Sequence, residues 1–190
     1  RVVSFRDMMI GWELRDHQQR FSHAEQLQPI ELPEPPATTF IGRFSRWMAD
    51  NSPRYQPNLA LLSAIATMAV LAGRKVEEPG GQRCNLYLIG LAESGHGKDF
   101  ALKQPGELLA MAGNPDLVFL SEPTSDAGVL TFLKKSPSAL WSCDEFGKHF
   151  ARVKKSKEGW QSAILDQLLK LFTSEGSAHY QGKGYAEEKS

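Results

Sequence analysis

The chain has 190 residues, of which 41% are hydrophobic and 23% are charged, and its 22 basic and 22 acidic side chains cancel. This composition excludes a disordered, collagenous or coiled-coil chain, and the zero net charge excludes a broadly basic nucleic-acid coat. The longest apolar run, residues 59–72, is shorter than a membrane span and is interrupted by Ser63 and Thr67. We therefore expect a cytoplasmic protein that has no membrane partner.

Prolines and apolar periodicity divide the chain into three parts. Residues 1–36 predict an N-terminal helical segment followed by a linker, because the prolines of its last residues are incompatible with a helix or a central strand. Residues 37–80 predict a helical subdomain, with apolar side chains at helical spacing over 40–49 and again over 59–72. Gly73 is expected to end the second of these helices.

Residues 81–190 alternate between strand-like and helical patterns. The strand-like segments are 83–89, 117–120 and 139–143, and the helical segments are 98–112, 125–134 and 160–172. This alternation predicts an α/β fold with a parallel sheet. Pro105 and Gly106 should break or kink the first helix. Cys84 and Cys143 lie in apolar stretches, so both are expected to be small buried thiols.

The strongest local motif is a glycine-containing loop, Ala92-Glu-Ser-Gly-His-Gly-Lys-Asp99, placed between a strand-like run and a helix. Backbone N–H groups of such a loop and the positive end of the helix attract an anion, and Lys98 adds a full charge. Gly95 and Gly97 would let the backbone approach phosphates closely. We expect the phosphates of ATP to bind this loop at Glu93, Ser94, Gly95, His96, Gly97, Lys98 and Asp99.

The loop departs from the common phosphate-binding pattern at two positions. Ala92 stands where the first glycine is usual, and Asp99 replaces the hydroxyl residue that holds Mg²⁺. We expect the Asp99 carboxylate to ligate Mg²⁺ instead, because Mg²⁺ prefers oxygen ligands. The alternative is that Asp99 only complements the positive helix terminus, and that the loop is an ordinary turn with an exposed lysine.

A second motif follows, in which the apolar run 138–143 ends in Asp144 and Glu145. Asp144 would hold Mg²⁺, and Glu145 would orient and activate the attacking water, so Glu145 and Lys98 are the expected catalytic residues. The 46 positions from Lys98 to Asp144 leave room for one additional strand. This order is typical of the additional-strand catalytic-glutamate class of P-loop NTPases. The alternative is an exposed acidic turn before a helix.

The sequence resembles the ATPase module of phage and prophage primase-helicases over roughly residues 36–187. The stretches that carry the resemblance are Tyr55-Gln-Pro-Asn-Leu-Ala, Leu71-Ala-Gly-Arg-Lys75, residues 85–99 and Asp144-Glu-Phe-Gly147. The resemblance implies a RecA/AAA+-like P-loop core related to superfamily 3, assembled from copies of itself as a ring, a hexamer, that acts on DNA. It also implies phosphate binding by Gly95, Gly97 and Lys98, with Asp144 and Glu145 serving metal and water.

The C-terminal tail, residues 175–186, combines three glycines with Tyr180, Lys183 and Tyr185. A lysine between stacking aromatic rings suits single-stranded DNA, although a surface loop is an equal alternative. The basic stretch 148–157 is better explained as a solvated helix face than as a phosphate-tracking patch. Only 46 residues follow Asp144, so the predicted core is expected to be incomplete at its C-terminus.

Three functions remain open at this point. The first is the core of an ATP-dependent DNA helicase or translocase from a phage or mobile-element replication protein. The second is a nucleotide-binding switch module without helicase activity. The third is a catalytically decayed remnant, in which Ala92 and Asp99 mark the loss of the site.

Overall fold

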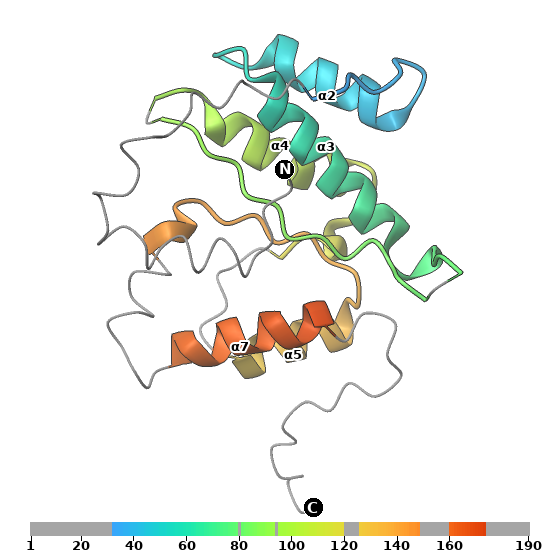
Figure 1. Ribbon diagram of the computed structural model, residues 1–190, viewed down its shortest axis with the longest axis vertical. Helices are drawn as coiled ribbons and strands as arrows, with labels where there is room; N and C mark the ends of the chain where they lie inside the picture. Colours follow the sequence, from blue (N-terminus) through green and yellow to red (C-terminus); the bar gives the residue numbers. More distant parts are fainter. Residues whose placement is uncertain (1–31, 80, 94, 120–125, 149–159, 174–190) are drawn as a thin grey trace, which may run out of the picture. The chain divides into compact units, whose positions relative to one another are not determined.

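The computed structural model describes residues 32–79, 81–93, 95–119, 126–148 and 160–173. The chain divides into two compact units, residues 1–34 and 35–190, and the elements described below all belong to the second. They are α2 (Phe40–Asn51), α3 (Pro57–Ala72), the 3₁₀ turn η2 (Gly73–Lys75), α4 (Lys98–Met111), the 3₁₀ turn η3 (Pro115–Leu117), α5 (Asp126–Lys135) and α7 (Trp160–Thr173), as Figure 1 shows. The predicted N-terminal helical segment lies outside the described residues.

The core of this unit is built where α2 packs on α3. The hydroxyl of Thr39 begins α2 by accepting a backbone N–H of the first turn at 3.0 Å. Phe44 and Met48 of α2 are buried together with Ala60 and Ala64 of α3. The short alanine side chains let the two helices approach closely, so both predicted helices are confirmed.

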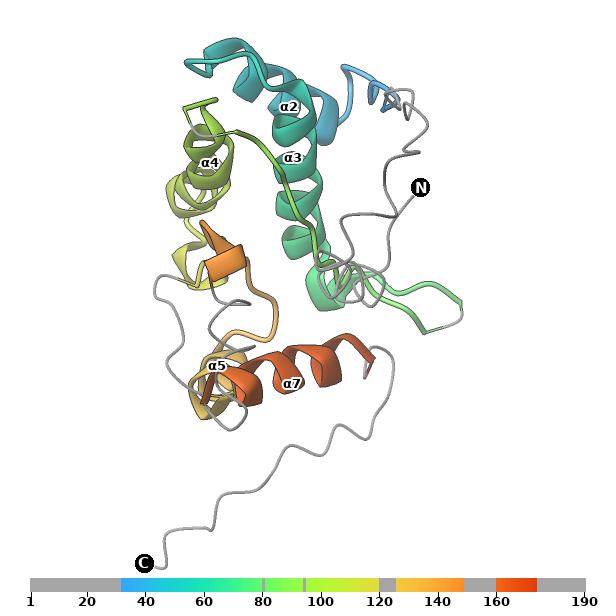
Figure 2. The ribbon, with the colours of Figure 1, turned by 60° about the vertical axis from the view of Figure 1, so that its left-hand side comes forward.

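The helix α3 also packs on α4, and both views place the three helices α2, α3 and α4 side by side (Figures 1 and 2). Together with η2 it forms a continuous helical stretch, Pro57–Lys75, that is long and apolar enough to cross a membrane, with a mean hydropathy of 1.3. Core helices of water-soluble proteins meet the same criteria. In this fold α3 contacts α2 and α4, which bury Ala60, Ala64 and Thr67 but leave Met68 exposed.

The predicted α/β fold with a parallel-sheet, RecA/AAA+-like P-loop core is wrong, because the residues that the structure describes contain helices and no β-strand. The only approach to a sheet among them is one isolated parallel bridge between Val118 and Leu140. Phe119 N–H donates to the Leu140 carbonyl at 2.8 Å, and Leu140 N–H donates to the Leu117 carbonyl at 2.7 Å. Leu117 belongs to the turn η3, so too few residues of the expected strand 117–120 remain to form a ladder of strand hydrogen bonds.

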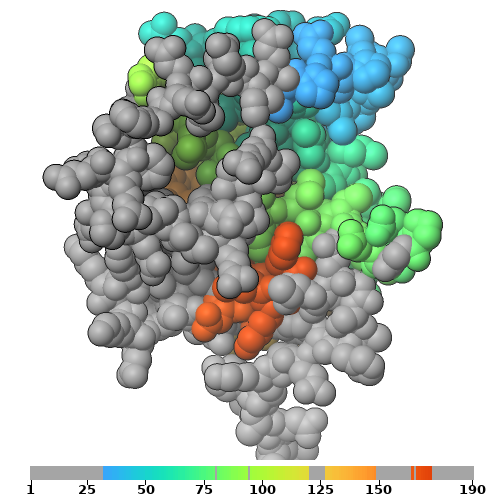
Figure 3. All heavy atoms as spheres, in the orientation of Figure 1, coloured from blue at the N-terminus to red at the C-terminus, as the bar shows by residue number. Residues whose placement is uncertain are grey.

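The first expected strand, residues 83–89, packs on a helix instead of pairing with another strand. The Asn85 amide donates to the Leu171 carbonyl at 3.1 Å, and the Tyr87 hydroxyl donates to the Leu168 carbonyl at 2.7 Å. The Tyr87 ring lies 5.4 Å from that of Phe172, between centroids. Figure 3 shows the resulting contact between the orange atoms of α7 and the green atoms of this segment. Burial raises the pKa of Tyr87 to about 12.

The side chains of this extended segment alternate between half-buried and exposed, and this alternation determines the exposure of Cys84. Residues 83, 85 and 87 are half-buried, whereas Cys84 between them is exposed. Cys143 is half-buried, and both thiols are free of a disulfide. The prediction of two buried thiols is therefore wrong, because an apolar neighbourhood in sequence does not fix which side of an extended segment faces the core.

The helices α4, α5 and α7 lie within one or two residues of the predicted ranges 98–112, 125–134 and 160–172. The expected break in α4 is absent, since the helix continues from Lys98 to Met111 with Pro105 inside it. Proline cannot donate to the carbonyl four residues earlier, which removes one hydrogen bond from the helix. The Pro105 side chain is buried, and that burial offsets part of the loss.

The Tyr87→Phe variant tests the contact of the extended segment with α7. Removing the hydroxyl should lower the free energy of unfolding by about 1 kcal/mol at pH 7. Since the folded pKa of about 12 exceeds the unfolded value of 10, the contribution of this tyrosine is complete below pH 10 and is lost as the pH rises toward 12. Urea unfolding between pH 7 and pH 11 should therefore show a smaller alkaline loss in the variant. Tyr55→Phe, at a side chain that is 69% exposed, should change neither quantity.

Candidate functional site

The glycine loop enters α4 through two left-handed residues. Gly95 has φ +78° and Gly97 has φ +75°, a region that other residues rarely adopt. Gly97 is the N-cap of α4 and has no side chain to accept the N–H groups of the first turn. Within that turn the Phe100 N–H donates to the Gly97 carbonyl at 3.3 Å. Lys98 is the first helical residue, so an anion placed here meets the positive end of the helix and the Lys98 ammonium.

The other predicted phosphate-binding residues flank these two glycines. The N–H of His96 donates to the Glu93 carbonyl at 3.3 Å, and the two side chains lie 3.9 Å apart between Nε2 and Oε2. Both side chains are exposed, and Glu93 places negative charge on the loop, which disfavours it as a phosphate ligand. Ser94 lies outside the described residues.

Arg54 lies directly against this loop, although nothing in the sequence indicated it. A β-carbon built on Gly97 would lie 3.1 Å from the Cβ and 3.5 Å from the Cγ of Arg54. The connection between α2 and α3 therefore packs the aliphatic part of the Arg54 side chain against the loop. The contact depends on how α2 and α3 are packed, and sequence spacing gave no signal for it.

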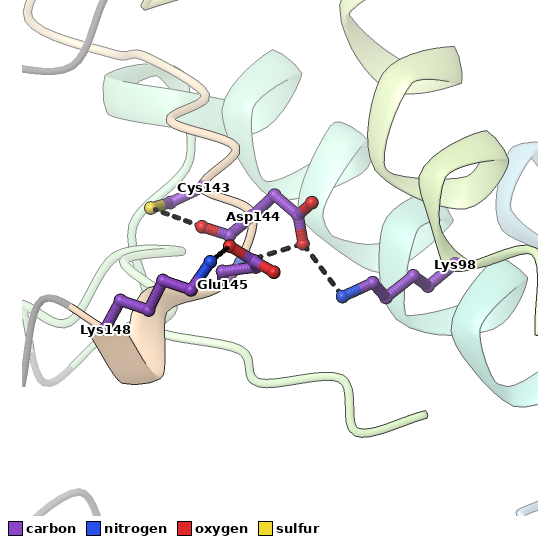
Figure 4. A network of polar contacts seen from close by, with 5 residues as sticks. All are labelled: Lys98, Cys143, Asp144, Glu145 and Lys148. Carbon is purple, nitrogen blue, oxygen red and sulfur yellow. Dashed lines mark hydrogen bonds and ion pairs between the residues drawn. The ribbon is translucent and has the colours of Figure 1, made fainter. Parts of the chain in front are cut away.

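The structure brings the two predicted motifs together through Lys98 and Asp144. The Lys98 Nζ lies 3.1 Å from the Asp144 Oδ1, and Figure 4 shows the two side chains pointing toward each other from different segments. The hydrogen bond and charge of Asp144 raise the pKa of Lys98. The same hydrogen bond, with Lys98 as donor, lowers the pKa of Asp144. Both groups are therefore charged at neutral pH.

Glu145 follows Asp144 in an unusual backbone conformation, with φ +50°. Its N–H donates to the Asp144 Oδ1 at 2.7 Å, and its carbonyl accepts from the Lys148 N–H at 2.7 Å. The Glu145 carboxylate is also paired with the Lys148 ammonium (Figure 4). Lys148 is the only member of the basic stretch 148–157 among the described residues, and here it is an ion-pair partner of the predicted catalytic base.

The predicted metal ligands are Asp144 and Asp99. Asp99 lies in the first turn of α4, next to Lys98, whose pKa its charge also raises. No group of three or more His, Cys, Asp or Glu side chains that could hold a metal ion occurs among the described residues. Mg²⁺ in nucleotide sites is usually held by one or two carboxylates, water and the phosphates themselves, and such a set needs no larger cluster.

The predicted DNA-contacting residues Tyr180, Lys183 and Tyr185 lie outside the described residues. No protein-family model, curated protein or solved structure matches the chain. The geometry around Lys98 and Asp144 is therefore the feature of this chain that bears on its function. That geometry offers a cation for phosphates, an anion for a metal ion and a neighbouring carboxylate for proton transfer.

A pair of glycine substitutions tests the shape of the loop. Gly95→Ala and Gly97→Ala both force a side chain into the left-handed region, which costs about 1–2 kcal/mol each. A new methyl group at Gly95 meets nothing within 4 Å, whereas one at Gly97 meets Arg54 at 3.1 Å. Urea unfolding should therefore show a larger loss of stability for Gly97→Ala. Equal losses would mean that Arg54 does not pack on the loop.

Proposed function

We propose that the chain binds ATP with Mg²⁺ at Lys98 and Asp144 and hydrolyses it with Glu145 as the base. The observation that carries this proposal is the 3.1 Å contact between Lys98 and Asp144, which joins two motifs that lie 46 positions apart in the chain. Magnesium-bound ATP requires a cation for its phosphates and an anion for its metal. The pair supplies both charges at one place.

The ion pair is suited to exchange its partners for a ligand. The Lys98 side chain is 36% exposed and the Asp144 side chain is 50% exposed. Ion pairs as exposed as this contribute about 0–1 kcal/mol, because water screens both charges. When the phosphates engage the Lys98 ammonium through charge-assisted hydrogen bonds, the gain exceeds this small loss. The Asp144 carboxylate is then released to face the metal ion.

The donor set around Asp144 fits Mg²⁺. The carboxylate oxygens of Asp144 and Asp99 are the hard ligands that this ion prefers, and both side chains are exposed. Bound Mg²⁺ would supply neutralisation of the charge that develops on the phosphate oxygens. Lys98 adds positive charge on the loop side of the same site.

Glu145 is the residue placed to move a proton. Its carboxylate would accept a proton from a water molecule as the water oxygen bonds to the γ-phosphorus of ATP. The bond from the γ-phosphorus to the bridging oxygen breaks, which gives ADP and phosphate. In the absence of ligand the Glu145 carboxylate is paired with Lys148, an exposed contact that is also inexpensive to open.

The resemblance to primase-helicase modules supports a motor function that is driven by this hydrolysis. We propose that a ring of these chains, within a phage or mobile-element replication protein, couples ATP turnover to movement along single-stranded DNA. A nucleotide-binding switch would bind ATP without DNA-stimulated turnover, and a decayed remnant would not bind it at all. Measuring ATP binding and turnover with and without an oligonucleotide separates these three functions.

Two substitutions separate binding from hydrolysis. Lys98→Ala should weaken ATP binding about 10- to 100-fold, because it removes a charge that faces the phosphates. Glu145→Gln should leave binding within about threefold but lower turnover by about 10²- to 10⁴-fold, since only proton transfer is lost. Isothermal titration and phosphate release measure the two quantities. Lys103→Ala, at an exposed lysine of the same helix, is the matched control and should change neither.

Two results would contradict the proposed roles. Normal turnover in Glu145→Gln would show that this carboxylate is not the base. A loss of ATP affinity in Lys103→Ala equal to that in Lys98→Ala would show that the general charge of α4, rather than the Lys98 site, attracts the nucleotide.

A magnesium titration tests the proposed role of Asp99. If its carboxylate ligates the metal, ATP binding should depend on Mg²⁺ more steeply in the parent chain than in Asp99→Ser, because the carboxylate repels phosphates until the metal is bound. Asp99→Ala should weaken metal-dependent binding, since no oxygen remains at this position. Three superimposable titrations would leave Asp99 as a charge that stabilises the start of α4 and nothing more.

A further inference from the structure

The exposed face of α2 carries a hollow of about 300 Å³ that none of the predicted site residues line. Its lining residues are Ala37, Arg43, Arg46, Trp47, Asp50 and Asn51. Arg43, Trp47 and Asp50 lie three and four positions apart and therefore share one face of the helix. We propose that this hollow binds single-stranded nucleic acid, with one base stacked on Trp47 and the neighbouring phosphates held by Arg43 and Arg46.

Trp47 is the first reason to expect a ligand here. Its side chain is 47% exposed, although it borders the apolar core between α2 and α3. The ring is held in place by Phe44, 6.0 Å away and nearly parallel to it, and by Phe100 of α4, 6.1 Å away. A fixed ring loses little conformational freedom when a base stacks on it, so binding keeps most of the stacking energy.

The charged side chains of the hollow are the second reason to expect a ligand here. Arg43 and Arg46 line the same hollow as the ring, and a guanidinium carries the planar set of N–H donors that fits a phosphate. Asp50 and Asn51 add acceptor oxygens to the lining, which suit N–H donors on the edges of bases, the N3–H of thymine included. The Asn51 amide donates to the Trp47 carbonyl at 2.8 Å, and this contact fixes the orientation of its oxygen.

These features favour a nucleic acid over an acidic polypeptide. An acidic peptide could use the two arginines, but its carboxylates make no use of the exposed indole face, whereas a nucleic acid offers both a base for the ring and phosphates for the arginines. A hollow of this volume has room for one base. The choice of a single strand as ligand rests on the proposed movement along DNA. The site shares no lining residue with the proposed ATP site, so a loss of oligonucleotide binding and a loss of ATP binding are distinguished by separate measurements.

The test measures the anisotropy of a fluorescein-labelled oligo(dT) of about 20 nucleotides, titrated with the full chain in the absence of ATP. Trp47→Leu should weaken binding about 5- to 100-fold through loss of stacking, and Trp47→Phe should stay within about threefold. The double variant Arg43→Gln, Arg46→Gln should weaken binding and lower the slope of log affinity against log salt by about 1.4.

A matched control removes the same charge elsewhere. The double variant Arg74→Gln, Lys75→Gln changes two exposed cations at the far end of α3 and should leave the affinity unchanged. Exposed arginines contribute little to folding, so the arginine variants should unfold at the parent temperature by circular dichroism. The proposal is overturned if the two double variants lose affinity equally, if Trp47→Leu binds like the parent, or if a polyglutamate peptide competes as well as unlabelled oligo(dT).

Discussion

Close packing of α2 on α3 is the constraint on which the remaining structure depends. Met48 and Ala64 are fully buried at this contact, and any larger side chain at Ala64 would separate the helices. Burial of a side chain such as Met48 contributes about 1.5–3 kcal/mol, whereas the exposed pair of Lys98 and Asp144 contributes about 0–1 kcal/mol. The place of the glycine loop is therefore set by helix packing, and the ion pair remains free to respond to a ligand.

The same packing links the two surfaces for which we propose ligands. The first turns of α4 present Lys98 to Asp144 and Phe100 to Trp47 of α2. Phe100 also packs against the buried cluster between α2 and α3. If a bound nucleotide shifted α4, Phe100 would therefore displace the Trp47 ring through their direct van der Waals contact.

Helices were predictable from this sequence and strands were not, for a physical reason. The periodicity over residues 40–49 and 59–72 reports a local property, the side of a helix that is buried, and α2 and α3 follow it. A strand needs a partner from elsewhere in the chain, which no local pattern reveals. Tyr87 illustrates this. It lies in an alternating segment that is typical of a strand, but its hydroxyl donates to the Leu168 carbonyl of α7. For the site, the order of the motifs pointed to Lys98 and Asp144, which lie in contact, and their functional roles stay predictions. The neighbour Arg54 came from helix packing that the sequence does not display.

The left-handed backbone of Glu145 has a consequence for how this protein could be altered. A side chain other than glycine, asparagine or aspartate costs about 1–2 kcal/mol in that conformation. Glycine or asparagine at this position would relieve the cost and would also remove the one carboxylate next to Asp144 that can accept a proton. Thermal robustness and the turnover that we propose would therefore make opposite demands on a single residue, and a chain optimised only for heat resistance would lose the proposed base first.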